Sequence, residues 1–147
     1  MISTRLLTAT DHAAWQAIWQ QYLDFYQTEL PNATTMHTWQ RLTNPAQTDM
    51  VGIGVFVDGT LAGFTHLVFH ANTWSEQACC YLEDLCVDEH QRGQGLGRAL
   101  IQAAQDLAIA MQCCRLYWVT TRDNHTAQIL YDKMATQTEF VQYKIGL

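Results

Sequence analysis

The sequence predicts an α/β fold in which helices flank one mixed β-sheet, and two observations lead to this class. Alternating apolar residues on either side of Asp58-Gly59 predict an antiparallel hairpin. Farther along, a buried strand, a glycine-rich turn, an amphipathic helix and a second buried strand follow in order, which predicts a parallel β-α-β unit. The 147 residues, 48% hydrophobic and 15% charged, suffice for one hydrophobic core. We therefore expect a single domain over residues 1–147.

The N-terminal third is predicted to be mainly helical. Asp11 is a candidate N-cap, and Pro31-Asn32 is expected to end the helix that follows it. A second, shorter helix is predicted over residues 34–42. Apolar residues at helical spacing predict that one side of the first helix faces the core, with a few rings free to line a cleft. They are Trp15, Ile18, Trp19, Tyr22, Leu23 and Tyr26.

The middle of the chain is predicted to form three strands, which span residues 51–57, 61–69 and 79–87. Asp58-Gly59 supplies the two residues of a tight turn between the first two strands. The third strand is mostly apolar but carries Glu83 and Asp84. Because a carboxylate is costly inside a buried strand unless it is paired, these two residues predict a functional site.

The C-terminal half is predicted to alternate helices and strands. The elements are a helix over 96–111, a strand over 115–121, a helix capped by Asn124, and a closing strand over 139–145. The first of these helices joins two parallel strands, so its connection is expected to be a right-handed crossover. The apolar face of the second helix includes Leu130 and Tyr131.

Charge and hydropathy exclude two classes of partner. Eight Lys and Arg residues against fourteen Asp and Glu residues give a net charge of −6. This is the wrong sign for binding nucleic acid, although it suits a cationic partner. No run of about 18 apolar residues is present, and residues 1–5 lack the pattern of a signal peptide. We therefore expect a soluble, cytoplasmic protein that binds neither nucleic acid nor membrane.

Cysteine and histidine spacing predicts no metal site. The five cysteines lack the spacing of a disulfide framework or a zinc site, so we expect reduced, buried thiols. They are Cys79, Cys80, Cys86, Cys113 and Cys114. Four of the histidines likewise lack ligand spacing and are expected to be surface or capping residues. They are His66, His70, His90 and His125.

A glycine-rich turn follows the strand that carries the two carboxylates. Glycines at the start of a helix expose backbone N–H groups beside the positive end of the helix dipole, which suits a phosphate or pyrophosphate. A dinucleotide fingerprint would need a third glycine at Arg98, and a Walker loop would need Gly-Lys-Ser/Thr, so neither fits. The turn comprises Arg92, Gly93, Gln94, Gly95, Leu96, Gly97 and Arg98.

The spacing of Arg92, Gly95 and Gly97 fits Arg/Gln-x-x-Gly-x-Gly/Ala, the coenzyme A pyrophosphate loop of the GNAT superfamily of N-acetyltransferases. The sequence resembles that family in two further places. Residues 83–87 stand where the family has its central strand, and Asn124 and Tyr131 match its Asn-x₆-Tyr helix. The resemblance is sharp over residues 81–143 and architectural before them.

This resemblance implies the GNAT fold, with a mixed, mostly antiparallel central sheet, a parallel β-α-β core that binds the cofactor, and flanking helices. Its element order is strand, two helices, hairpin, long strand, loop, helix, strand, helix, strand. It also implies an acetyl-CoA-dependent N-acetyltransferase that needs no metal. Within the family, three segments resemble the branch that acetylates polyamines, small amines or histone tails. They are Glu83-Asp84-x-x-Val87, Tyr131-Asp132-Lys133 and the ending Phe140-Val141-Gln142-Tyr143.

The resemblance further implies direct attack of a primary amine on the thioester. An alkylammonium with a pKa of about 10.4 is only about 0.1% neutral near pH 7.4, so a base is needed. Glu83 is the expected base, acting through water, with Asp84 as the alternative. An ordinary strand would send only one of the two carboxylates into the acceptor cleft, but a bulge could alter this. A purely structural carboxylate, paired with an arginine or a backbone N–H, is the other interpretation.

Other site residues follow from the same resemblance. Tyr131 is expected to protonate the leaving thiolate, although on sequence alone it could be a core residue. The backbone groups of Leu85, Cys86 and Val87 are expected to bind the amide-bearing arm of the cofactor, like an added strand. Asn124 is expected to cap its helix and to face the same arm.

The acceptor stays open among polyamines, lysine-like amines, aminoglycosides and histone tails. The second function class is a GNAT-fold module that binds acyl-CoA as a sensor or interaction partner without turnover. The presence of both Glu83 and Tyr131 favours the enzyme.

The closing strand predicts a homodimer. Apolar side chains at a sheet edge are normally covered, and pairing with a second copy would cover them. The alternative is a monomer whose own loops shelter the strand. The apolar residues concerned are Phe140, Val141, Tyr143 and Ile145.

Overall fold

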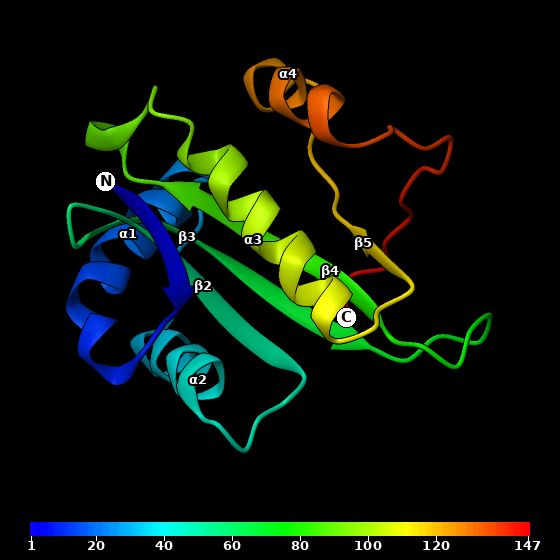
Figure 1. The fold of residues 1–147 in the computed structure, drawn as a ribbon, viewed down its shortest axis with the longest axis horizontal. Helices are drawn as coiled ribbons and strands as arrows, with labels where there is room; N and C mark the ends of the chain where they lie inside the picture. The colour runs from blue at the N-terminus through cyan, green and yellow to red at the C-terminus, as the bar shows by residue number, and fades with distance from the viewer.

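A five-stranded mixed sheet forms the centre of the fold, and helices cover both of its faces (Figure 1). The computed structural model describes residues 1–147. The strands lie in the order of their numbering: β1 (Ile2–Leu6), β2 (Met50–Val57), β3 (Thr60–His70), β4 (Cys79–Val87) and β5 (Arg115–Tyr117). Neighbours from β1 to β4 are antiparallel, and β4 and β5 are parallel. The predicted fold class, a mixed and mostly antiparallel sheet with a parallel unit, is therefore confirmed.

Four α-helices and two short 3₁₀ helices connect and flank these strands. They are η1 (Ala9–Asp11), α1 (His12–Phe25), α2 (Asn32–Thr43), η2 (Glu89–Gln91), α3 (Leu96–Ala110) and α4 (His125–Met134). None of these helices combines the length and the apolar character needed to cross a membrane.

The β2–β3 hairpin forms as its turn residues predict. Asp58 and Gly59 have φ angles of 49° and 84°, the left-handed values that a type I′ hairpin turn requires at both positions. Val57 pairs with Thr60 directly across this turn. The hairpin supplies two strands of the sheet on which both layers of helices pack.

Helices α1 and α2 cover one face of the sheet with an aromatic core. Trp15 and Trp19 of α1 and Trp39 of α2 are buried there against Phe64 of β3. The Trp15 and Trp39 ring centroids lie 4.8 Å apart. The expectation that the first helix buries its tryptophans is therefore confirmed.

Helix α1 begins directly after Asp11, as predicted, but its C-terminal end and the role of the Asp11 side chain differ from the prediction. The helix ends at Phe25, well before Pro31, because the N–H of Thr28 donates to the carbonyl of Leu23 and Gln27 takes a left-handed φ of 51°. This Schellman-type ending satisfies the last carbonyls without a proline. At the other end, the Asp11 carboxylate accepts hydrogen bonds from Arg5 and from the Thr8 backbone, and it does not cap α1.

Helix α3 covers the opposite face and forms a second, aliphatic core. Leu96, Leu100 and Ala104 of this helix are buried against Val55 of β2 and Leu67 of β3. The connection from β4 through α3 to β5 is the predicted β-α-β unit. This core fixes the position of the glycine-rich turn, which leads directly into α3.

The C-terminal region departs most from the predicted elements. Strand β5 has three residues, since its register with β4 stops at the Tyr81–Tyr117 pair and the predicted continuation to residue 121 leaves the sheet. Residues 139–145 form no strand, and Phe140 and Tyr143 are 84% and 91% exposed. A strand needs a neighbour for its backbone groups, and here no other strand lies beside this segment. The closing-strand prediction is therefore wrong for the single chain.

The cysteines are all free, but their burial differs from the expectation. Cys79, Cys80 and Cys86 are buried, whereas Cys113 is half-buried and Cys114 is exposed. The last two enter β5 from a turn, which explains their access to solvent. The sulfur atoms of Cys79 and Cys114 lie 3.5 Å apart. No group of three or more His, Cys, Asp or Glu residues is arranged to hold a metal ion.

Candidate functional site

A groove of about 680 Å³ runs between the C-terminal half of α1, the end of β4, the glycine-rich turn and α4. All of the cofactor and catalytic residues predicted from the sequence line it except Glu83 and Gln94. Its lining consists of Gln21, Tyr22, Phe25, Tyr26, Leu85, Cys86, Val87, Arg92, Gly93, Gly95, Leu96, Gly97, Arg98, Asn124, Thr126, Ala127, Ile129, Leu130, Tyr131 and Lys133.

The glycine-rich turn has the geometry of an anion site. Gly93 and Gly95 have φ angles of 84° and 78°, in the left-handed region that side-chain-bearing residues rarely adopt, and no heavy atom lies within 4 Å of the space their Cβ atoms would fill. Gly95 precedes α3, whose first N–H groups have no acceptor within the helix. Arg92 and Arg98 line the same end of the groove. Open backbone N–H groups and two guanidinium groups fit a pyrophosphate.

Gln94 lies in the turn but outside the lining of the groove. Its side-chain amide donates to the carbonyl and to the side-chain oxygen of Gln91, at 3.1 and 2.8 Å. Only its backbone belongs to the turn that faces the groove.

Close packing holds α4 beside the start of α3. A Cβ atom on Gly97 would come within 3.2 Å of the Leu130 side chain, so glycine permits the two helices to approach this closely. This contact places Tyr131, the next residue of α4, on the wall of the groove. The Tyr131 ring packs edge-on against the Trp118 ring, with the two ring centroids 5.4 Å apart. Burial, and secondarily the nearby Tyr26, raises the pKa of the Tyr131 hydroxyl, which therefore stays protonated as a proton donor must.

The end of β4 forms another wall. Beyond Tyr81, β4 has no strand neighbour on the β5 side, so the backbone of Leu85 to Val87 borders the groove instead of a sheet partner. An extended ligand with amide groups could pair with this free edge. Gln21 of α1 holds the loop that follows, since its side chain donates to Asp88 and accepts from the Glu89 N–H.

Asn124 lines the groove but does not cap α4. Its side-chain amide donates to the Thr120 hydroxyl at 3.1 Å, and no side-chain cap bond forms at the start of the helix. Only its backbone carbonyl joins the helix, as acceptor for the Gln128 N–H. The predicted cap is therefore wrong, and the amide lies beside the groove.

A β-bulge in β4 turns both carboxylates toward the α1 face of the sheet. His66 pairs with Asp84 and Leu67 pairs with Leu82, which leaves Glu83 without a partner. Leu82 and Leu85 are three residues apart, yet both pack in the α3 core, so the strand does not alternate regularly between them. The bulge, which the sequence pattern allowed but did not predict, is therefore present, and it places the two carboxylates on the same face of the sheet.

The two carboxylates affect each other and the rings around them. Glu83 is an exposed residue, yet partial desolvation of its carboxylate, and secondarily the negative charge of Asp84, raises its pKa. Burial and the charges of both carboxylates raise the pKa of Tyr81. On the other side, burial and the charge of Asp84 raise the pKa of Tyr22, which also lines the groove. Asp84 therefore lies beside Tyr22 on the α1 wall of the groove, and Glu83 is its neighbour in β4.

His66 was missed by the sequence analysis. It is 2% exposed, its Nε2 accepts a hydrogen bond from the Trp15 indole at 3.0 Å, and its Nδ1 lies 2.8 Å from the Asp84 carboxylate. The expectation of a surface or capping residue is wrong, because β3 turns this side chain to the buried α1 face. The signal that could have found it is its spacing of two from Phe64, which packs on the same face.

The other three histidines differ among themselves. His90 is exposed, His125 is the exposed first residue of α4, and the Nε2 of His70 hydrogen-bonds to the Tyr117 hydroxyl at 2.7 Å.

Several groove residues were also not singled out from the sequence. Phe25 and Ile129 are the clearest, since both are large apolar residues that are 65% and 61% exposed.

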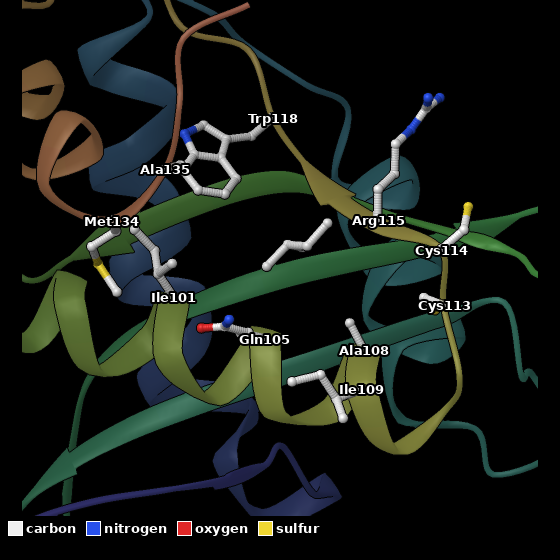
Figure 2. Close-up of a pocket in the computed structure, with 11 residues that line it drawn as sticks. Ile101, Gln105, Ala108, Ile109, Cys113, Cys114, Arg115, Trp118, Met134 and Ala135 are labelled. Atoms are coloured by element: carbon white, nitrogen blue, oxygen red, sulfur yellow. The ribbon is translucent and has the colours of Figure 1, made fainter.

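A second hollow, of about 300 Å³, lies between the middle and end of α3, β5 and the end of α4 (Figure 2). Its lining is mostly apolar and includes Ile101, Trp118 and Met134. Figure 2 shows that the Arg115 side chain extends away from α3. Titratable groups that could act as acid and base do not converge here, so this hollow lacks the chemistry of the larger groove.

Comparisons with known proteins agree with this geometry. The model of the acetyltransferase (GNAT) family matches residues 12–135. A D-amino-acid N-acetyltransferase of Saccharomyces cerevisiae, HPA3, is 32% identical over 144 residues, which cover 97% of this chain and 89% of that protein.

Solved structures with low sequence identity share the fold. The aminoglycoside N-acetyltransferase AAC(6')-Iy, in complex with the bisubstrate analog CoA-S-monomethyl-acetylneamine, superposes with a TM-score of 0.86 at 17% identity, over 100% of this chain and 99% of that one. A ribosomal-protein-alanine N-acetyltransferase from Brucella melitensis biovar Abortus superposes with a TM-score of 0.80 at 20% identity, over 100% of both chains. The chain therefore belongs to the acetyltransferase (GNAT) family and is an acetyl-CoA-dependent N-acetyltransferase.

Proposed function

We propose that this enzyme acetylates the primary amine of a small molecule or of a lysine-like side chain by direct attack on acetyl-CoA, within one catalytic domain over residues 1–147. One observation carries the proposal: the glycine-rich turn and Tyr131 line one groove, and Asp84, next to Glu83 in β4, lies beside Tyr22 on the α1 wall of that groove. Their negative charge suits an ammonium group. The name of the yeast relative adds D-amino acids to the acceptors to be tested.

Coenzyme binding is assigned to three parts of the groove. The open N–H groups of residues 93–98, with Arg92 and Arg98, would hold the pyrophosphate. The free edge of residues 85–87 would bind the amide-bearing arm, and the Asn124 amide would face the same arm. The close approach of Gly97 in α3 and Leu130 in α4 supports this assignment, because it places the glycine-rich turn and the α4 residues on opposite walls of one groove.

The proposed reaction divides its proton transfers between the two walls. Glu83 takes a proton from the acceptor ammonium through water, and the free amine nitrogen then attacks the thioester carbonyl carbon. As the carbon–sulfur bond breaks, the Tyr131 hydroxyl gives its proton to the leaving sulfur. The acylated nitrogen loses its second proton, which passes through water to the Tyr131 oxygen, so that a neutral amide and a protonated tyrosine result. The raised pKa of Glu83 supports its role as a base, because a carboxylate with a higher pKa accepts a proton more readily.

Release of thiol from acetyl-CoA over a panel of amines tests this proposal. The panel contains spermidine, lysine, a D-amino acid, an aminoglycoside and a histone-tail peptide. We expect turnover with at least one of them, and a large loss of that turnover in Tyr131→Phe. Binding of acetyl-CoA without turnover on any amine would support the alternative, an acyl-CoA-binding module.

We also propose a homodimer, in which a second copy covers the C-terminal segment. Phe140, Tyr143 and Ile145 expose large apolar side chains, and β5 is an edge strand with one free edge beside the apolar hollow of Figure 2. Exposed apolar residues next to a free edge favour pairing with another chain. Light scattering is expected to give twice the chain mass of 16.8 kDa. A mass of one chain, unchanged by acetyl-CoA, would contradict the dimer, and Val141→Glu is expected to dissociate it.

The cytoplasm is the proposed location, with no nucleic-acid partner. Five free cysteines, one of them exposed, suit a reducing compartment, and the net charge of −6 repels phosphate. Cell fractionation tests the location, and a nucleic-acid mobility shift at low salt tests the absence of binding.

A further inference from the structure

A buried chain of hydrogen bonds leads from the core of α1 to the paired carboxylates. The Trp15 indole donates to Nε2 of His66, and the other ring nitrogen of His66 lies 2.8 Å from Oδ2 of Asp84. Trp15 is fully buried and the His66 side chain is 3% exposed, whereas the Asp84 side chain reaches the surface with 15% exposed. The three residues are far apart in the sequence, so only the fold assembles this chain.

The donor of each hydrogen bond follows from chemistry. An indole N–H can only donate, so Nε2 of His66 must be an acceptor and carries no hydrogen. The ring hydrogen is therefore on Nδ1, and it is donated to the Asp84 carboxylate. Trp15 thus fixes the tautomer of His66 that can hold Asp84.

Aromatic packing fixes the imidazole plane. The ring of Phe64 stacks on His66 with centroids 4.5 Å apart and an interplanar angle of 14°. The Trp19 ring lies 5.3 Å away on the same side of the sheet. A ring held by stacking and by two hydrogen bonds cannot rotate without losing all of these contacts.

Asp84 itself is fixed at the bulge. The Thr65 hydroxyl donates to the Asp84 backbone carbonyl at 2.8 Å, so the backbone is held while His66 holds the carboxylate. Glu83, the preceding residue of β4, is the one that the bulge leaves without a partner on β3. The direction in which Asp84 presents its charge therefore depends on His66.

We propose that His66 is a positioning residue of the acceptor site, which acts through Asp84 and is itself held in one tautomer by Trp15. This inference rests on the proposed function, since Asp84 can affect turnover only if the acceptor amine binds beside the carboxylate pair. His66 does not contact substrate in this arrangement. Replacing His66 is therefore expected to change the binding of the acceptor amine and to leave the binding of acetyl-CoA unchanged.

Steady-state kinetics of His66→Phe test this inference with whichever amine the wild type acetylates. We expect the KM for the amine to rise about tenfold, because a hydrogen bond to a charged group is lost, and the KM for acetyl-CoA to stay unchanged. Leu67→Ala, a buried change on the opposite face of the same strand, is the matched control for lost stability, and we expect it to change neither KM. An amine KM that stays at the wild-type value in His66→Phe, or that rises equally in Leu67→Ala, would overturn the inference.

A double-mutant cycle tests whether His66 acts through Asp84. In an Asp84→Asn background, His66→Phe is expected to add little further change to the amine KM. Effects that multiply would mean that the two residues act independently, and would overturn the inference.

If His66→Phe does not fold, His66→Gln replaces it. Its amide can donate to Asp84 and accept from Trp15, so it is expected to keep the amine KM within about threefold of the wild type. A tenfold rise in a folded His66→Gln would overturn the inference.

Nitrogen NMR of the wild-type imidazole gives a readout that needs no variant. The Nδ1–H tautomer supports the arrangement, and a hydrogen on Nε2 overturns it. Failure of the proposed function looks different: the wild type then acetylates no amine on the panel, which overturns both proposals. Turnover by the wild type with unchanged kinetics in His66→Phe overturns only this one.

Discussion

The proposed coenzyme side and the proposed acceptor side of the site are built in different ways. On the coenzyme side, the glycine-rich turn, the first turn of α3 and the free end of β4 are contiguous in the sequence. On the acceptor side, Trp15, His66 and Asp84 come from α1, β3 and β4. The first arrangement depends on local backbone conformation, and the second depends on strand register and core packing.

This difference means that the two sides should respond differently to mutation. Changes on the coenzyme side act through the backbone geometry of one turn and through one hydroxyl, so single substitutions should abolish a function outright. Changes on the acceptor side act through charge and orientation, so they should shift kinetic constants and pH profiles. We therefore expect the largest effects at Tyr131 and Gly95, a smaller one at Glu83, and the smallest at Asn124, whose side chain only borders the groove.

Tyr131→Phe removes only the hydroxyl on the α4 wall of the groove. We expect turnover to fall by roughly 10²–10⁴-fold, because proton donation to the leaving sulfur is lost, with acetyl-CoA affinity retained. Single-turnover kinetics and calorimetry measure the two quantities separately. Unchanged turnover would return Tyr131 to a packing role against Trp118.

Gly95→Asp places a side chain and a negative charge in the turn, at a left-handed φ of 78°. At 100 times its dissociation constant, acetyl-CoA should stabilise the wild type by about 2.7 kcal/mol, and we expect the variant to lose this stabilisation. Melting curves with and without acetyl-CoA provide the measurement. Equal shifts in the two proteins would refute the assignment of the pyrophosphate to this turn.

Glu83→Gln tests the acceptor side through its pH profile. Partial desolvation and the charge of Asp84 raise the pKa of Glu83, so on acidification the wild type should lose activity at a higher pH than it would with an unperturbed glutamate. Without this base, the amine must lose its proton unaided, and the optimum should move to higher pH. The other groups near Glu83 are His66, Tyr81 and Tyr117, which the variant leaves in place. A profile identical to that of the wild type would point to Asp84 or to bulk water as the base.

Asn124→Ala is expected to have the smallest effect, and it distinguishes a helix-capping role of this side chain from a role in lining the groove. Loss of an N-cap typically costs about 1 kcal/mol, but this side chain caps nothing, so we expect a smaller loss in denaturant unfolding. The KM for acetyl-CoA should nevertheless rise, since the amide lines the groove. A full capping penalty with an unchanged KM would contradict both statements.

Much of the fold follows from short-range patterns. The hairpin was predictable because Asp58-Gly59 tolerates left-handed φ angles, and α3 was predictable because its apolar residues recur at helical spacing. The end of α1 and the loss of a cap at Asn124 were not, since each depends on which of several polar partners a side chain or backbone group meets. Strand 139–145 failed for the same reason at a larger scale. Its apolar pattern is that of a strand, but no strand edge in the chain pairs with it.

The sequence by itself determined the α/β class, the family and the glycine-rich turn that lines the groove, because backbone conformation and helix amphipathicity are encoded within a few neighbouring residues. Only the tertiary structure decided the acceptor side. The bulge at Glu83 depends on how β4 pairs with β3, and the burial of His66 depends on how α1 packs on the sheet. A one-residue change of register would send His66 or Asp84 to the other face, and no local pattern specifies that register on its own.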